Sequence, residues 1–139
     1  MIRKIRENLY LGSLSENRKF NGVKLCVLEH DKWDRNSITP DTIILPIIET
    51  KDLIYSPKDC KNIVNDININ IGVSLIDEYI KNETPVLVHC QMGRERSALM
   101  VIYYLHKKEN LDLKVAYKEV KRLKPNIQNR LYWLNEEIK

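Results

Sequence analysis

A short apolar strand, a loop with a single glycine and a wholly apolar helix follow one another directly between residues 86 and 105. The apolar run at residues 86–88 is typical of a buried strand, and the unbroken apolar run at residues 98–105 is typical of a buried helix. A strand that passes through a tight loop into a helix directs successive backbone N–H groups into one hollow. That hollow lies at a helix N-terminus, where the helix dipole favours an anion. The stretch therefore predicts an anion-binding loop.

Both ends of this loop carry residues that suit phosphoryl transfer. Cys90 follows the strand, and Arg96 stands immediately before Ser97 at the start of the helix. The field in such a hollow favours the thiolate form of a cysteine, and a thiolate beneath a bound phosphate is a nucleophile. A guanidinium group can bind phosphate through two parallel hydrogen bonds. The sequence thus predicts a nucleophilic Cys90 and a phosphate-binding Arg96.

Strands and helices alternate along much of the chain, which predicts an α/β fold. We expect a central, mostly parallel sheet of four to five strands flanked by helices. The expected strands cover residues 9–11, 23–28, 42–48 and 86–88. The expected helices run from a Ser56 cap to about residue 81, either unbroken or divided at Gly72, and then over residues 97–108, 113–124 and 129–138. In such sheets ligands bind beyond the carboxyl ends of the strands, where Cys90 falls.

The composition sets wider bounds on the protein. Its 139 residues suit one domain over residues 1–139, and a net charge of +4 suits an anionic substrate without arguing for nucleic acid. The longest apolar run is too short to span a membrane. The odd number of cysteines, three, argues for a reducing compartment. We expect a cytoplasmic monomer with no cofactor, no metal and no stable nucleic-acid partner.

Other reactive side chains receive simpler interpretations. Cys26 and Cys60 are expected to be small buried hydrophobic residues rather than partners of Cys90. Glu29 opens an acidic stretch whose spacing matches no common metal site, so a polar loop after a strand is expected there.

The loop also resembles a known signature. His89-Cys90-x-x-Gly93-x-x-Arg96-Ser97 is similar to the HCxxGxxR[ST] phosphate loop of cysteine-dependent protein tyrosine phosphatases. Further segments resemble the dual-specificity subgroup, so that the likeness extends over nearly the whole chain. They are residues 7–13, 45–47 and 75–78, together with Lys124-Pro125, which stands where the subgroup has Arg-Pro.

The resemblance implies a role for each loop residue. Cys90 would attack phosphorus and form a cysteinyl-phosphate, Ser97 would stabilise the thiolate as it leaves, and His89 would tune the reactivity of Cys90. The phosphate would be held by the Arg96 side chain and by the backbone of Gln91, Met92, Gly93, Arg94, Glu95 and Arg96.

The general acid is left open by the sequence. The resemblance implies an aspartate on the loop after the third strand, roughly 30 residues before the cysteine. Different ways of counting arrive at Asp52, Glu49 or Asp59. We favour Asp52, because it lies in an irregular segment and an unusually long following helix would account for its distance from Cys90. Glu49 and Asp59 remain alternatives.

The expected function is hydrolysis of phosphotyrosine, and of phosphoserine and phosphothreonine, in protein substrates. The same chemistry on a phospholipid or on an RNA 5′-phosphate is the alternative, supported by the second loop cation Arg94 and by the net charge of +4. A non-catalytic phosphate-binding module is a third reading. It is disfavoured because both the nucleophile and the arginine are present.

Overall fold

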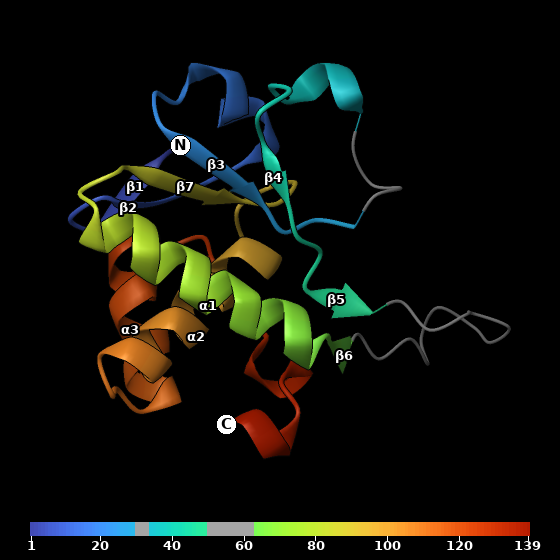
Figure 1. The fold of residues 1–139 in the computed structure, drawn as a ribbon. Helices are drawn as coiled ribbons and strands as arrows, with labels where there is room; N and C mark the ends of the chain where they lie inside the picture. The colour runs from blue at the N-terminus through green and yellow to red at the C-terminus, as the bar shows by residue number, and fades with distance from the viewer. Residues whose placement is uncertain (30–33, 50–62) are drawn as a thin grey trace, which may run out of the picture.

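The computed structural model describes residues 1–29, 34–49 and 63–139. Its centre is a five-stranded sheet in the order β1-β2-β7-β3-β4, drawn in Figure 1. The strands are β1 (Arg3–Arg6), β2 (Leu9–Gly12), β3 (Val23–Cys26), β4 (Ile43–Ile44) and β7 (Val86–His89). The strands β2, β7, β3 and β4 run parallel to one another, and β1 pairs antiparallel with β2. The predicted α/β fold with a mostly parallel sheet is confirmed.

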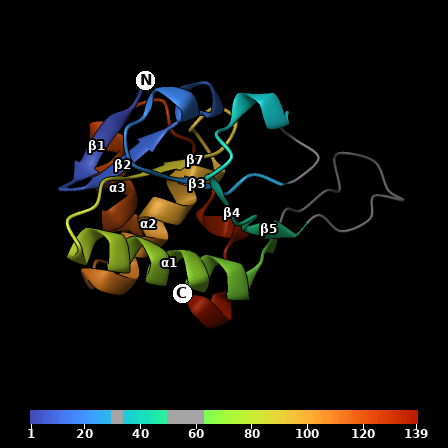
Figure 2. The same cartoon turned by 45° about the horizontal axis from the view of Figure 1, so that its top comes forward.

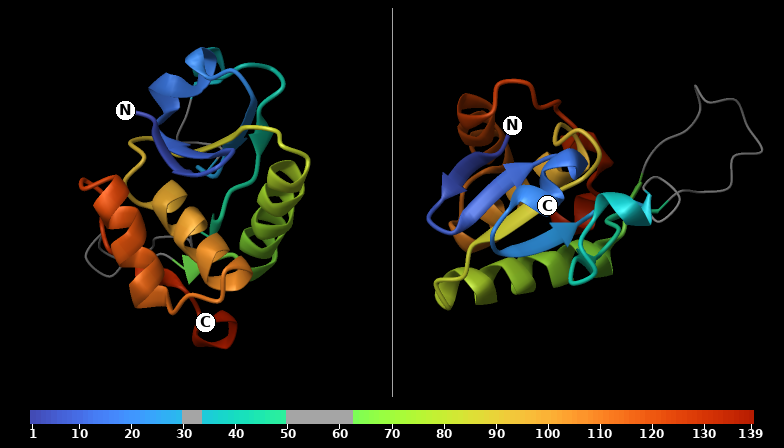
Figure 3. Two further views of the ribbon diagram at one scale, coloured as in Figure 1. Left: turned by 90° about the vertical axis from the view of Figure 1, so that its left-hand side faces the viewer. Right: turned by 90° about the horizontal axis from the view of Figure 1, so that it is seen from above.

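Three α-helices lie together on one face of this sheet (Figures 1 and 2). They are α1 (Asp66–Lys81), α2 (Arg96–Lys108) and α3 (Leu113–Leu123). Helix α2 lies between the other two (Figure 3), and all its residues from 97 to 105 are buried, as their apolar sequence predicts. Because α2 follows β7 after one short loop, the packing of this core helix also positions the loop.

The remaining short elements lie around this core. A 3₁₀ helix, η1 (Leu14–Lys19), lies on the face of the sheet opposite the α-helices (Figure 1). A second short helix, η3 (Arg35–Ser37), follows β3 along the chain. Two-residue strands β5 (Ile48–Glu49) and β6 (Ile63–Val64) pair antiparallel in a separate small sheet. None of the helices in the described part of the chain is long and apolar enough to cross a bilayer.

The prediction of one long helix from Ser56 to about residue 81 is wrong about where the helix begins. Residues 63–64 form β6, and α1 begins only at Asp66. The Asn65 side chain caps it by accepting a hydrogen bond from the Asn68 N–H at 3.0 Å. Ser56 lies outside the described residues. Helix α1 is also continuous through Gly72. A long helix therefore no longer supports the choice of Asp52 as the acid.

Two other expected elements are divided. The strand expected over residues 42–48 is interrupted around Pro46 into β4 and β5, since proline cannot donate a ladder hydrogen bond. In place of a helix at residues 129–138 the chain forms two 3₁₀ turns, η5 (Leu131–Trp133) and η6 (Glu136–Ile138). The Asn129 side chain accepts from the Leu131 N–H at 3.1 Å, a local bond that competes with helical hydrogen bonding.

Candidate active site

The loop between β7 and α2 is fixed against the end of β2. Gly93 has a φ of 71°, and a Cβ atom there would lie 2.6 Å from the Gly12 carbonyl oxygen. Only glycine fits this conformation at this approach. The Leu14 N–H donates to the Gln91 carbonyl at 3.1 Å. The loop is thus held in one shape by the neighbouring parallel strand.

The polar backbone groups of the loop divide into two sets. The carbonyl groups of Gln91, Arg94 and Glu95 each accept a backbone hydrogen bond, from Leu14, Gln128 and Leu99 respectively. Among the described residues, the N–H groups of residues 91–95 donate to no protein acceptor. Donors without protein partners at the start of a helix form the anion-binding arrangement that the sequence predicts.

Cys90 and Ser97 meet at the floor of this loop. The Cys90 Sγ atom lies 3.1 Å from the Ser97 Oγ atom, and both residues are buried. A hydroxyl at this distance can donate a hydrogen bond to a thiolate, which lowers the free energy of the charged sulfur. The structure therefore brings together the cysteine and the hydroxyl that the resemblance pairs.

Arg96 forms an ion pair that the sequence did not predict. Its Nη2 atom donates to Glu29 Oε2 at 3.0 Å, and its Nε atom donates to Glu29 Oε1. Glu29 lies in the polar loop that the sequence predicts after this strand, but its contact with Arg96 was not predicted. The available signal was topological: Glu29 follows β3, a parallel neighbour of β7, so both carboxyl ends lie at one edge of the sheet.

An aromatic ring also contacts the Arg96 side chain. The guanidinium carbon lies 5.7 Å from the centre of the Trp133 ring, within the range of a cation–π interaction. Arg130 contacts Trp133 as well, with its guanidinium carbon 5.2 Å from the centre of the ring. The Nε atom of Arg130 lies 3.6 Å from Glu95 Oε2. The turn at Trp133 thus helps to fix the Arg96 side chain. The sequence did not predict this contact, because a helix was expected at residues 129–138.

His89, the residue before Cys90, has a buried ring with a defined tautomer. The Asn17 side-chain oxygen accepts from the Thr39 N–H at 2.8 Å, so its amide nitrogen faces His89 Nε2 at 2.9 Å. The Nε2 atom must then accept, and the Nδ1 N–H donates to the Cys90 carbonyl at 3.2 Å. Burial lowers the pKa of His89 from its usual 6.5, which favours this neutral ring.

Two further buried groups surround the loop. Cys26 lies opposite His89 in the ladder, and burial raises the pKa of its thiol to about 11, which keeps it protonated. Lys124 is 3% exposed and its ammonium group donates to the Asn126 side chain at 2.9 Å. Burial lowers the pKa of Lys124. This lysine is the first residue of the Lys-Pro pair noted in the sequence, and it lies beside Gly93.

The candidates for the general acid fall largely outside the described residues. Asp52 and Asp59 both lie outside the described residues, and so does the third cysteine, Cys60. Glu49 is an exposed residue of β5 and pairs with Ile63 of β6.

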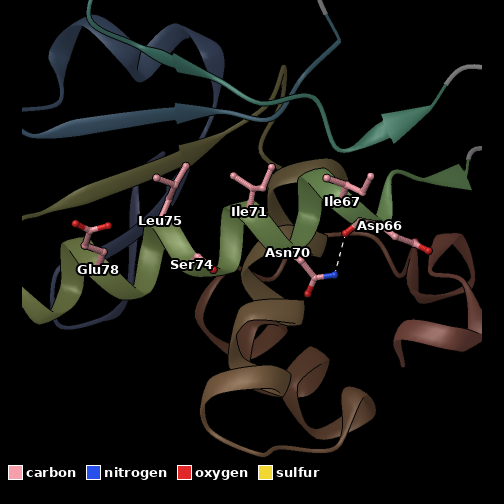
Figure 4. A pocket seen from close by; sticks show the side chains of 7 residues that line it. All are labelled: Asp66, Ile67, Asn70, Ile71, Ser74, Leu75 and Glu78. Carbon is pink, nitrogen blue, oxygen red and sulfur yellow. Dashed lines mark hydrogen bonds between the residues drawn. The ribbon is translucent and has the colours of Figure 1, made fainter.

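One hollow of the described residues is remote from the loop. It has a volume of about 520 Å³ and follows one side of α1, where Ile67 and Ile71 are exposed (Figure 4). Asp66 and Glu78 are its only charged lining residues, so it would repel phosphate. A hollow of about 390 Å³ instead adjoins the loop, and its lining includes Gln91, Met92 and Arg94.

Comparisons with known proteins agree with this geometry. The family model described as "Dual specificity phosphatase, catalytic domain" matches residues 13–136. The chain is 30% identical over 124 residues to dual specificity protein phosphatase 1 of Arabidopsis thaliana, covering 87% of this chain and 59% of the relative. It is 41% identical over 65 residues to human dual specificity protein phosphatase 7, covering 47% of this chain and 16% of the relative. The chain thus spans less than two thirds of the length of each of these relatives.

Solved structures show the same fold. The crystal structure of PTPMT1 superposes with a TM-score of 0.72 at 18% identity, covering 99% of this chain and 88% of that one. The human tyrosine phosphatase-like serine/threonine/tyrosine-interacting protein also gives 0.72, at 20% identity, covering 95% and 89%. The family model covers most of the chain and the fold agrees with it, so this chain belongs to the dual specificity phosphatase family, with the family's catalytic domain at residues 13–136.

Proposed function

We propose that this chain is a phosphomonoester hydrolase that removes phosphate from phosphotyrosine, and from phosphoserine and phosphothreonine, in proteins. The observation that carries the proposal is the Cys90 sulfur, 3.1 Å from the Ser97 hydroxyl, in a loop whose N–H groups have no acceptor among the described residues. Family membership supports the same reaction. The domain is proposed to be a single unit over residues 1–139 and to act as a monomer in the cytoplasm.

In the first step the Cys90 thiolate attacks phosphorus. The S–P bond forms as the bond from phosphorus to the substrate oxygen breaks, and the leaving oxygen takes a proton from the general acid. The loop N–H groups and the Arg96 guanidinium stabilise charge on the three other phosphate oxygens. Glu29 accepts hydrogen bonds from the Nε and Nη2 atoms of that guanidinium, so the Arg96 side chain has little rotamer freedom left to lose when it binds the phosphate.

In the second step water attacks the cysteinyl-phosphate. The same acid, now ionised, accepts a proton from the water, inorganic phosphate forms and the S–P bond breaks. The electron pair returns to sulfur as a thiolate, and the Ser97 hydroxyl stabilises it by a hydrogen bond. His89 supports this arrangement through its hydrogen bond to the Cys90 carbonyl.

The deciding experiment is turnover of para-nitrophenyl phosphate by the wild-type chain and by Cys90→Ser, with and without vanadate. We expect turnover that vanadate inhibits and that Cys90→Ser abolishes. Activity that survives Cys90→Ser would contradict the mechanism. An inactive wild-type chain that still binds phosphotyrosine would instead support a non-catalytic binding module.

Asp52 remains our proposal for the acid, with Glu49 and Asp59 as alternatives. Replacing the true acid with its amide should lower turnover of an alkyl phosphate about 100-fold, because a poor leaving group needs the proton. Turnover of an aryl phosphate should fall less. Asp52→Asn, Glu49→Gln and Asp59→Asn form a matched set, and full alkyl-phosphate turnover by Asp52→Asn would remove Asp52 from the mechanism.

The second candidate function is the same chemistry on a phospholipid or an RNA 5′-phosphate. Arg94 favours it, since this exposed loop cation forms no ion pair among the described residues. A structure of PTPMT1, similar in fold, was solved in complex with PI(5)P. Rates on phosphopeptides, phosphatidylglycerophosphate, phosphoinositides and 5′-triphosphate RNA would separate these substrates.

A further inference from the structure

A buried lysine that the proposed mechanism does not use lies against the phosphate loop, residues 90–96. Lys124 follows the last residue of α3, and its Nζ atom would lie 3.3 Å from a Cβ atom placed on Gly93. Its backbone is fixed, because its N–H donates to the Val120 carbonyl at 2.8 Å and its carbonyl accepts from the Ile127 N–H at 3.3 Å. The residue is only 3% exposed. An ammonium group is thus held inside the protein beside the glycine of the loop.

This ammonium group has no close counter-charge in the described part of the chain. Its one hydrogen bond there goes to the Asn126 side-chain oxygen at 2.9 Å, a neutral acceptor, and no carboxylate lies within ion-pair distance of it. The Glu16 carboxylate acts on Lys124 only from a distance, and it accepts from the Ser13 N–H at 3.0 Å. Burying an ammonium group without a counter-charge is costly, so negative charge nearby must offset the cost.

The negative charge that meets this need lies in the loop. Burial lowers the pKa of Lys124, and the charge of Cys90 is the largest of the effects that oppose burial. The charges of Arg94 and Arg3 are positive and lower the pKa of Lys124 further. An interaction between two charges is mutual, so Lys124 stabilises an anion at Cys90 by as much as that anion stabilises Lys124. Solvent screens such an interaction little in the protein interior.

We propose that Lys124 is a positioning residue of this site, whose buried ammonium group stabilises the negative charge that the loop holds on the Cys90 sulfur and on the bound phosphoryl group, without touching either. The proposal rests on the proposed function and deepens it. Arg96 and the loop N–H groups contact the phosphate oxygens, whereas Lys124 acts across Gly93. The hydrogen bond to Asn126 orients the ammonium group before substrate binds. A charge already in place needs no reorganisation during the reaction.

The test separates charge from shape by comparing two anions. Tungstate and perrhenate are tetrahedral oxyanions of similar size, and the first is a dianion whereas the second is a monoanion. Calorimetry measures the binding of each to the wild-type chain and to Lys124→Met, which keeps most of the side-chain volume and removes its charge. We expect the affinity for tungstate to fall about tenfold and that for perrhenate about threefold, because the lost interaction scales with the charge of the ligand. A change in the shape of the loop would weaken both anions alike.

Two matched variants serve as controls. Lys124→Arg keeps the charge, so the ratio of the two affinities should stay within about twofold of the wild type. Turnover of para-nitrophenyl phosphate should follow the same pattern, with kcat/KM about tenfold lower in Lys124→Met and within about threefold of the wild type in Lys124→Arg. Lys118→Met removes an exposed charge from α3, which solvent screens, and should change neither binding nor turnover. Circular dichroism checks folding, and Lys124→Gln, with the same expected result, replaces a Lys124→Met chain that does not fold.

Outcomes that overturn the role of Lys124 differ from those that overturn the phosphatase. Equal losses for the two anions, unchanged affinities in Lys124→Met, or a Lys124→Arg chain that behaves like Lys124→Met would each contradict the role. A wild-type chain that binds neither anion would contradict it too. Turnover that depends on Cys90 would leave the phosphatase standing in each case. Conversely, a chain without turnover that prefers tungstate only while Lys124 is present would support the role of Lys124 alone.

Discussion

At the scale of single residues, the Ser97 hydroxyl is the group that lies against the Cys90 sulfur, at 3.1 Å. If it stabilises the leaving thiolate, Ser97→Ala should slow breakdown of the cysteinyl-phosphate more than its formation. We expect kcat to fall about 100-fold, the scale seen when one donor to a developing charge is lost. Stopped-flow turnover of para-nitrophenyl phosphate should then show a burst of product. Ser97→Thr keeps the hydroxyl and should show no burst, whereas an unchanged kcat in Ser97→Ala would contradict the role.

His89 links the site to the stability of the fold. Burial holds its pKa in the folded chain below the usual 6.5. The unfolded chain therefore binds a proton at His89 more readily, so this contribution to stability is complete above about pH 6.5 and is lost as the pH falls below it. Protonation would also place an N–H group against the Asn17 amide nitrogen.

We expect the free energy of unfolding to fall between pH 7.5 and pH 5, and to fall less in His89→Gln. Urea unfolding at several pH values in this range measures both. Equal losses in the two proteins would show that His89 does not carry the effect.

Not every residue of the candidate site could be predicted. Cys90, Arg96 and Ser97 lie within one short stretch, so a local pattern predicts that they meet, and the contact between Cys90 and Ser97 is found. Glu29 and Asn17 reach the same site from other strands and turns. Such contacts depend on which strands are neighbours in the sheet, and a single sequence does not state that order.

At the scale of elements, the end of α1 carries a residue in an unfavourable conformation. Glu83 has a φ of 55°, its N–H donates to the Ile80 carbonyl, and the next N–H, of Thr84, donates to the Tyr79 carbonyl. This is the Schellman arrangement, in which glycine is usual because a side chain there is strained.

Glu83→Gly should raise the free energy of unfolding by about 1 kcal/mol. Urea denaturation measures the change, and Glu83→Ala, which keeps a Cβ atom, is the control that should gain little. The residue is exposed and precedes β7, whereas the phosphate loop follows the other end of that strand, so turnover should not change. A loss of stability in Glu83→Gly would contradict the strain.

Element types were predicted best where local signals and burial agree. Helix α2 is apolar on every side and is buried, and Asp112 caps α3 as its sequence position suggests. The predicted start of α1 was wrong because Ser56-Pro57 is a strong local signal for the start of a helix. The helix that forms is capped by Asn65 instead. Residues 63–64 fit the helical pattern, but they form β6 because they pair with β5. A tertiary contact thus overrides the local preference.

At the scale of the whole molecule, one core joins the sheet to the three helices. Ile102 is 1% exposed in the middle of α2, and the cluster around it extends from β1 to η6. A single core predicts that residues 1–139 unfold in one cooperative transition.

Ile102→Ala should lower the free energy of unfolding by about 2–5 kcal/mol, because it leaves a cavity in the core. In the wild type and in the variant alike, tryptophan fluorescence and far-ultraviolet circular dichroism should agree on the urea midpoint of that protein. Val115→Ala, at a half-exposed position of α3, should change stability by less than about 0.5 kcal/mol. Separate midpoints for the two probes would show that the chain is not one unit.

The central position of β7 has a consequence for motion. This strand lies between β2 and β3, both parallel to it, and its four residues are all buried. Amide hydrogens in such a strand exchange with solvent only when the whole domain opens, whereas those of an edge strand such as β1 exchange through local fraying. The strand that ends immediately before Cys90 should therefore be among the slowest parts of the molecule to exchange. The Cys90 sulfur would then remain anchored on every timescale shorter than global unfolding.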